Sequence, residues 1–175
     1  MVFKPTIKSD VLLSEVKIIA PDIYREKRGS IWTSFSSEDY DGLVPQKFNH
    51  DKFSISKRNV LRGIHGDHKS WKLVSCPYGD ILAVIVDLRM DSPTYMQHSK
   101  YRLNAENNFQ ILIPPSFGNS FYVLSEEALY HYKFSYLGDY IDRGLQSKSV
   151  IDRLLSLEKE GIKSIFLMGN HEQVM

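Results

Sequence analysis

The feature that most constrains the fold is a series of short apolar segments divided by glycine- and proline-rich turns. Residues 81–88 (ILAVIVDL) are too short for a typical helix and rich in β-branched side chains, which predicts a strand buried on both faces. Similar short segments recur at regular spacing in residues 72–76, 101–103, 110–113, 121–124 and 129–136. Such a succession favours a mainly β sandwich or barrel.

The pattern changes after about residue 137. Residues 147–160 repeat apolar side chains at the spacing of a helix, Gly161 is a suitable stop, and residues 165–168 (IFLM) are typical of a buried strand. Helix and strand together predict a short C-terminal α/β segment. We therefore expect a mainly β domain over residues 1–140, followed by a separate segment over residues 141–175.

Composition narrows the class of protein. The chain has 175 residues and a net charge of +1, so it offers no global basic field for nucleic acid. No apolar run approaches the roughly 18 residues of a membrane span. The single cysteine, Cys76, rules out an internal disulfide and fits a reducing compartment. We expect a cytoplasmic protein without nucleic-acid or membrane partners.

Residues 59–71 (NVLRGIHGDHKSW) are the best candidate for a site. They place Arg62 and Lys69 with His65 and His68 around two glycines. A histidine in such a glycine-rich turn could accept a proton beside an anionic ligand. The two histidines lack the His-x-His spacing of a cupin metal site, so we expect no metal there. We expect the other histidines to lie on the surface or around the site: His50, His68, His98 and His131.

Four short motifs then suggest a family. In order they are RG at residues 28–29; LRGIH at 61–65 with KLV at 72–74; VDLR at 86–89 with SPT at 92–94; and AEN at 105–107 leading to IPP at 113–115. Their order and spacing resemble the dTDP-4-dehydrorhamnose 3,5-epimerase family over about residues 18–140. The resemblance implies a cupin-type jelly roll that inverts C3, C5 or both of a nucleotide-linked 4-keto sugar.

The resemblance also implies roles for individual residues. His65 would be the base, Tyr132 the acid on the opposite face of the sugar, and Lys72 the partner of the enolate oxygen. Histidine, with an ordinary pKa of about 6.5, suits removal of a proton next to a ketone. Arg28 and Arg62 would bind the diphosphate. No cofactor or metal is required, and a homodimer is implied in which Arg28 serves the partner's site.

Within this family, the chain resembles a subgroup that acts on GDP-linked 4-keto heptoses more closely than it resembles the rhamnose enzymes. The subgroup resembles this chain in RGxIWT (28–33), HDKF (50–53), LRGIHGD (61–67) and PPxxGNS (114–120). Rhamnose enzymes usually carry Glu in place of Thr33, Asn-His in place of Lys52-Phe53, and His in place of Asn119. We expect Lys52 and Asn119 to contact the substrate.

The C-terminal residues resemble a different family. GDYIDRG (138–144) and GNHE (169–172) resemble calcineurin-like metallophosphoesterases, in which Asp139 would bridge two metals, Asn170 would ligate one and His171 would assist at the phosphate. The family's opening Asp-x-His element and its later histidines have no counterpart in this sequence. We therefore expect a fragment that holds no metal. It also replaces the region that supplies a carboxylate partner for the catalytic histidine of the rhamnose enzymes.

Three functions remain open on the sequence alone. The first is a 4-keto-sugar epimerase. The second is a non-catalytic cupin that binds a sugar nucleotide. The third, least favoured, is a metal-dependent phosphatase.

Overall fold

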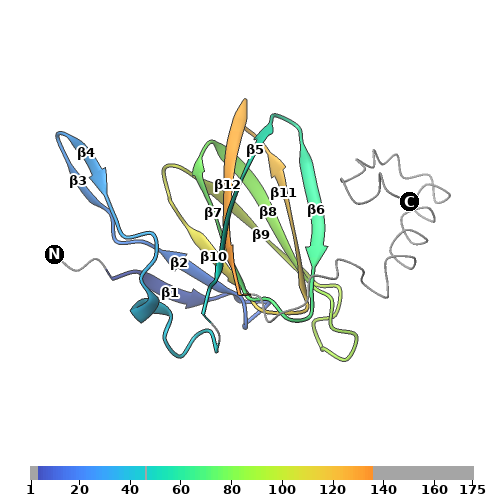
Figure 1. Ribbon diagram of the computed structural model, residues 1–175. Helices are drawn as coiled ribbons and strands as arrows, with labels where there is room; N and C mark the ends of the chain where they lie inside the picture. Colours follow the sequence, from blue (N-terminus) through green and yellow to red (C-terminus); the bar gives the residue numbers. More distant parts are fainter. Residues whose placement is uncertain (1–3, 46, 136–175) are drawn as a thin grey trace. The chain divides into compact units, whose positions relative to one another are not determined.

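Two antiparallel β-sheets packed face to face form the body of the structure, a computed structural model that describes residues 4–45 and 47–135 (Figure 1). The first sheet has six strands in the order β1 (Thr6–Ser9), β2 (Lys17–Ala20), β10 (Gln110–Ile113), β7 (Lys72–Tyr78), β12 (Glu127–Phe134) and β5 (His50–Lys57). The second has four, in the order β6 (Leu61–Gly66), β11 (Phe117–Val123), β8 (Asp80–Asp87) and β9 (His98–Asn104). The mainly β, cupin-type sandwich expected from the sequence is confirmed.

Two smaller elements lie outside these sheets. Strands β3 (Tyr24–Glu26) and β4 (Gly29–Ile31) form a hairpin of their own, and Ser37–Tyr40 forms a single 3-10 helix, η1. No helix in the described part of the chain is long and apolar enough to cross a membrane. The predicted C-terminal α/β segment lies outside the described residues.

The core lies between the two sheets and follows from the alternation of the strands. In β8, Ile81, Ala83 and Ile85 are almost fully buried, as expected for side chains that share one face of a strand. They pack in one cluster with Val74 and Ile111 of the opposite sheet. Burial of this apolar surface is the main driving force that holds the sheets together.

Strand β6 differs from the sequence-based expectation. His65 was predicted in a glycine-rich turn, but it lies within β6, paired with β11. Gly63 explains the misleading composition: it has φ +114°, and a Cβ there would lie 2.7 Å from the Asn119 carbonyl oxygen. The glycine therefore permits close approach of two strands and does not mark a turn.

Candidate active site

One wall of the candidate site is formed by β6 and β11. His65 is directly opposite Asn119, and Arg62 is directly opposite Phe121. Directly opposed residues on paired strands share a face of the sheet, and Asn119 and Phe121 are buried toward the sandwich interior. His65 and Arg62 are three residues apart and would point to opposite faces of a regular strand. A register irregularity between Asn119 and Phe121 places both opposite buried residues of β11, although His65 and Arg62 are themselves exposed.

The other wall comes from the six-stranded sheet. Tyr132 on β12 packs against the core cluster together with Tyr130, so alternate residues of β12 face inward. Lys52 on β5 is directly opposite Tyr132 and therefore lies on the same face, with its ammonium 5.3 Å from the centre of the Phe134 ring. The predicted acid and the predicted base thus come from different sheets.

Lys72, at the start of β7, connects the two walls. Its ammonium donates to the His65 carbonyl oxygen and to Asn119 Oδ1, each at 3.4 Å. It also lies 3.3 Å from Asp67 Oδ2, and only 15% of the Lys72 side chain is exposed. A half-enclosed cation is therefore held beside the His65 strand, as stabilisation of a developing oxyanion requires.

Asn119 also binds Tyr130, a contact that the sequence did not suggest. The Asn119 Nδ2 group donates to the Tyr130 hydroxyl oxygen at 3.1 Å, and both side chains are buried. Burial raises the pKa of Tyr130 well above its ordinary range, so this hydroxyl stays neutral. In the sequence, Tyr130 is marked only by its position two residues before the predicted acid, which places both on the same face of a strand.

The positive charge of Arg62 acts on the Tyr132 hydroxyl. Partial burial raises the pKa of Tyr132, and the positive charge of Arg62 opposes this only in part. Arg62 is fixed by a 2.8 Å hydrogen bond from its Nε to Ser56 Oγ of β5. The Tyr132 hydroxyl therefore stays protonated at physiological pH.

Arg28 does not join the other six predicted residues. It follows β3 in the turn of the β3–β4 hairpin, its side chain is 85% exposed, and its Nη2 lies 2.5 Å from Glu26 Oε1. The β3–β4 hairpin forms a sheet of its own, seen at the upper left of Figure 1. Within the described chain, His65, Tyr132, Lys72, Lys52, Arg62 and Asn119 come together, and Arg28 does not.

The outer face of the six-stranded sheet holds a polar cluster around His131. His131 is only 8% exposed, so of the two places expected for this histidine, the surface or the surroundings of the site, the surface is excluded. Its Nε2 lies 2.5 Å from Asp51 Oδ1, its Nδ1 lies 3.3 Å from Ser75 Oγ, and the Phe53 ring stacks on it. These residues are on the face opposite to Tyr132, because alternate residues of β12 point to opposite sides.

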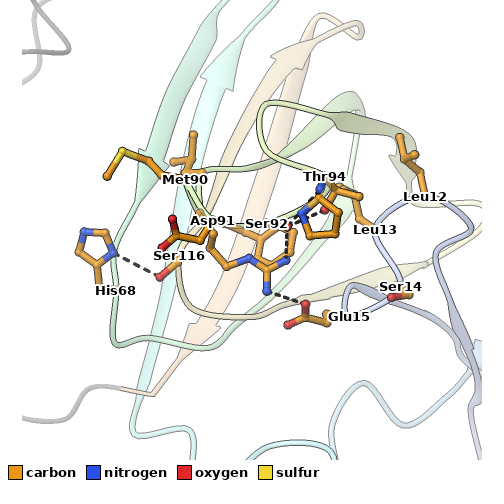
Figure 2. Close-up of a pocket in the computed structure, with 14 residues that line it drawn as sticks. Leu12, Leu13, Ser14, Glu15, His68, Met90, Asp91, Ser92, Thr94 and Ser116 are labelled. Carbon is orange, nitrogen blue, oxygen red and sulfur yellow. Dashed lines mark hydrogen bonds and ion pairs between the residues drawn. The ribbon is translucent and has the colours of Figure 1, made fainter.

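A cavity of about 550 Å³ lies elsewhere, between the loop after β8 and the turn between β1 and β2 (Figure 2). Arg89, which lines this cavity, donates to both carboxylate oxygens of Asp87 and to Glu15. The guanidinium also lies over the Phe117 ring. Arg89 and Asp87 thus form the structural turn pair of this loop, and none of the seven predicted site residues lines the cavity.

The phosphatase-like residues Asp139, Asn170 and His171 lie outside the described residues. Among residues 4–45 and 47–135, no group of three or more His, Cys, Asp or Glu side chains is arranged to hold a metal ion.

Comparison with known sequences identifies one family in each case. The sequence profile of the dTDP-4-dehydrorhamnose 3,5-epimerase family matches residues 10–151. The chain is 38% identical to the dTDP-4-dehydrorhamnose 3,5-epimerase of Salmonella typhimurium over 126 residues, which cover 69% of each chain. It is 36% identical to the Shigella flexneri enzyme of the same name over 132 residues, covering 73% of this chain and 72% of the relative.

Solved structures agree with the sequence matches. The epimerase RmlC of Legionella pneumophila, in complex with dTDP-4-keto-L-rhamnose, has a TM-score of 0.72 and 38% identity, covering 77% of this chain and 73% of that one. The dTDP-4-dehydrorhamnose 3,5-epimerase of Bacillus anthracis, with TDP and PPi bound, has a TM-score of 0.72 and 29% identity, covering 78% and 80%.

Proposed function

Because the chain belongs to the dTDP-4-dehydrorhamnose 3,5-epimerase family, we propose that it inverts C3, C5 or both of a nucleotide-linked 4-keto sugar, with His65 as base and Tyr132 as acid. The family assignment makes the protein an isomerase of 4-keto sugar nucleotides. The observation that carries the residue roles is the position of the two side chains. They come from different sheets: His65 lies directly opposite the buried Asn119, Tyr132 packs against the core, and the Lys72 ammonium lies beside the His65 strand.

The proposed reaction proceeds through an enolate. His65 takes a proton from the carbon next to the ketone, and the electron pair of that C–H bond moves toward the ketone oxygen. Lys72 stabilises the negative charge on this oxygen. Tyr132 then donates its proton to the opposite face of the same carbon, and exchange with solvent restores both side chains. Protonation on the face opposite to removal gives inversion.

Substrate selection is the finer part of the proposal. We infer a GDP-linked 4-keto heptose, since Thr33, Lys52-Phe53 and Asn119 differ from the residues usual in rhamnose enzymes. In support of this, Asn119 is an interior residue that contacts Lys72, so a change at this position alters the surroundings of the reacting oxygen. A ratio of kcat/KM values that favours the dTDP-linked sugar would contradict the inference.

A homodimer in the cytoplasm completes the proposal. Its support is an apolar outer face on the six-stranded sheet: Phe53 and Ile55 are each 62% exposed and lie opposite His131 and Leu129. Apolar patches of this kind often mark protein interfaces. The single free thiol, Cys76, is buried, which fits a reducing compartment.

The test of the proposed chemistry is solvent exchange. The protein is incubated in deuterated water with dTDP-4-keto-6-deoxyglucose and, separately, a GDP-linked 4-keto heptose, and incorporated deuterium is read by mass spectrometry. We expect exchange with the wild type and with the surface variant His98→Asn, and none with His65→Asn, which still binds the sugar nucleotide. Exchange that survives His65→Asn would overturn the role of this base. Binding by the wild type without exchange would favour a non-catalytic cupin.

A further inference from the structure

Asp67 lies between β6 and β7 and is fixed before any ligand arrives. Its Oδ1 accepts hydrogen bonds from the backbone N–H groups of Lys69 (3.0 Å) and Ser70 (2.6 Å). Its own carbonyl oxygen accepts the backbone N–H of Ser116 at 2.7 Å. One carboxylate oxygen thus organises the turn, and the other, Oδ2, lies 3.3 Å from the Lys72 ammonium.

Three oxygens surround the Lys72 ammonium, and they differ in charge. The His65 carbonyl and Asn119 Oδ1 are neutral acceptors at 3.4 Å, whereas Asp67 is a carboxylate. In the described part of the chain it is the one ion-pair partner of Lys72. Burial raises the pKa of Asp67, but the Lys72 charge and the two backbone N–H groups outweigh it, so the net pKa is lowered. The carboxylate is therefore ionised at neutral pH.

The contacts to Lys72 are long. Charge-assisted N–H···O bonds are usually about 2.7–2.9 Å, and all three contacts here exceed this range. The ammonium is thus held in place without being tightly bound to any one acceptor. The ammonium can therefore move closer to the ketone oxygen of the substrate as negative charge develops on that oxygen. Such a contact strengthens in the transition state and stabilises it more than the ground state.

We propose that Asp67 is a positioning residue for the epimerisation: its carboxylate holds the Lys72 ammonium beside His65 and Asn119, where the enolate oxygen forms. This inference rests on the proposed function. Asp67 acts through Lys72 and does not touch the substrate. In the sequence, Asp67 ends the LRGIHGD motif and precedes Lys72 by five positions, but nothing there relates the two residues.

The substitution Asp67→Asn separates this role from a purely structural one. The amide keeps an oxygen for the backbone N–H groups of Lys69 and Ser70 but removes the charge. We expect kcat to fall about tenfold, less than the roughly 10²-fold that a 1 Å misplacement of a catalytic group can cost, with KM little changed. Asp91→Asn, which removes an exposed carboxylate from the loop after β8, is the matched control and should leave both parameters unchanged.

A double-mutant cycle provides the decisive readout. Lys72→Met should lower kcat by about 10²-fold, as loss of an oxyanion partner does. Adding Asp67→Asn to Lys72→Met should then cost nothing further, because the residue through which Asp67 acts is gone. A full additional tenfold loss in that background would overturn the proposal, as would an unchanged kcat in Asp67→Asn alone.

A second measurement does not depend on activity. The rate at which acetic anhydride acetylates the Lys72 amine, followed by peptide mass spectrometry, should rise severalfold in Asp67→Asn and stay constant in Asp91→Asn. An unchanged rate would overturn the proposed contact even in an active enzyme. Failure of the wild type to exchange deuterium would instead overturn the proposed function, and the acetylation result would still decide whether Asp67 holds Lys72.

Discussion

His65 and Asn119 lie directly opposite each other on the antiparallel strands β6 and β11, and both accept a hydrogen bond from the Lys72 ammonium. His65 accepts through its backbone carbonyl and Asn119 through its side chain. One cation of the six-stranded sheet therefore fixes the relative position of two residues of the four-stranded sheet. This relationship makes Asn119 a structural member of the site as well as a candidate for contact with the sugar.

Asn119 should also contribute to stability through Tyr130. In Asn119→Leu the buried Tyr130 hydroxyl loses its donor, and an unsatisfied buried polar group costs about 1–3 kcal/mol. The free energy of unfolding from urea denaturation should fall by that amount. In a Tyr130→Phe background the same substitution should cost clearly less, and an equal cost in both backgrounds would contradict the pairing.

Tyr132→Phe should separate proton removal from inversion. The phenyl ring preserves the packing against Tyr130 and Phe134 but has no proton to give. We expect formation of the inverted sugar to fall by about 10²- to 10⁴-fold, the range for loss of a general acid, while deuterium still enters at the carbon that His65 deprotonates. Nuclear magnetic resonance of the product sugar in deuterated water measures both. Inversion at the wild-type rate would contradict the role of Tyr132.

Asp87 should make stability depend on acid pH. Hydrogen bonds from Arg89 hold the pKa of this fully buried carboxyl below its ordinary range, with help from Ser92 and Thr94 and against the effect of burial. Because its pKa is lower in the folded state, this carboxyl stabilises the protein at pH values above the pKa of the unfolded state, about 3.9. The stabilisation is lost as the pH falls from there toward the folded-state pKa.

The substitution Asp87→Asn tests this directly. Breaking a buried ion pair costs about 3–5 kcal/mol at neutral pH, which denaturant unfolding would show. The stability of the variant should also fall less steeply than that of the wild type below about pH 4. Parallel curves for the two proteins would exclude Asp87 as a source of the acid dependence.

Exposed side chains of β5 should control assembly. Phe53→Ser combined with Ile55→Ser removes two apolar groups from the outer face of the six-stranded sheet. We expect the proposed dimer to dissociate to monomers in sedimentation velocity experiments, because apolar burial drives such association. Leu124→Ser, a change at an exposed apolar residue outside β5, should leave the dimer intact. A wild type that sediments as a monomer would contradict the dimer itself.

The hydrophobic pattern of the sequence was sufficient to predict strands in which buried residues alternate with exposed ones or follow one another without interruption. The apolar run at residues 81–88 predicts β8 (Asp80–Asp87), and the alternation at residues 129–136 predicts most of β12 (Glu127–Phe134). The pattern failed at β6 and at the start of β11, where glycines resembled turns. A Cβ at Gly118 would lie 2.5 Å from Ile64 Cγ2, so this glycine is required by a residue more than fifty positions away.

The sequence by itself determined the family, the sandwich and the types of residue in the candidate site, because strand periodicity and short motifs are local properties. Only the tertiary structure decided that six of the seven predicted residues converge while Arg28 lies apart on its hairpin. It also decided that Asp67 and Asn119 hold Lys72. These contacts depend on the register of paired strands and on the packing of two sheets face to face. Both bring together residues that no local sequence pattern relates, so the sequence alone does not predict the contacts.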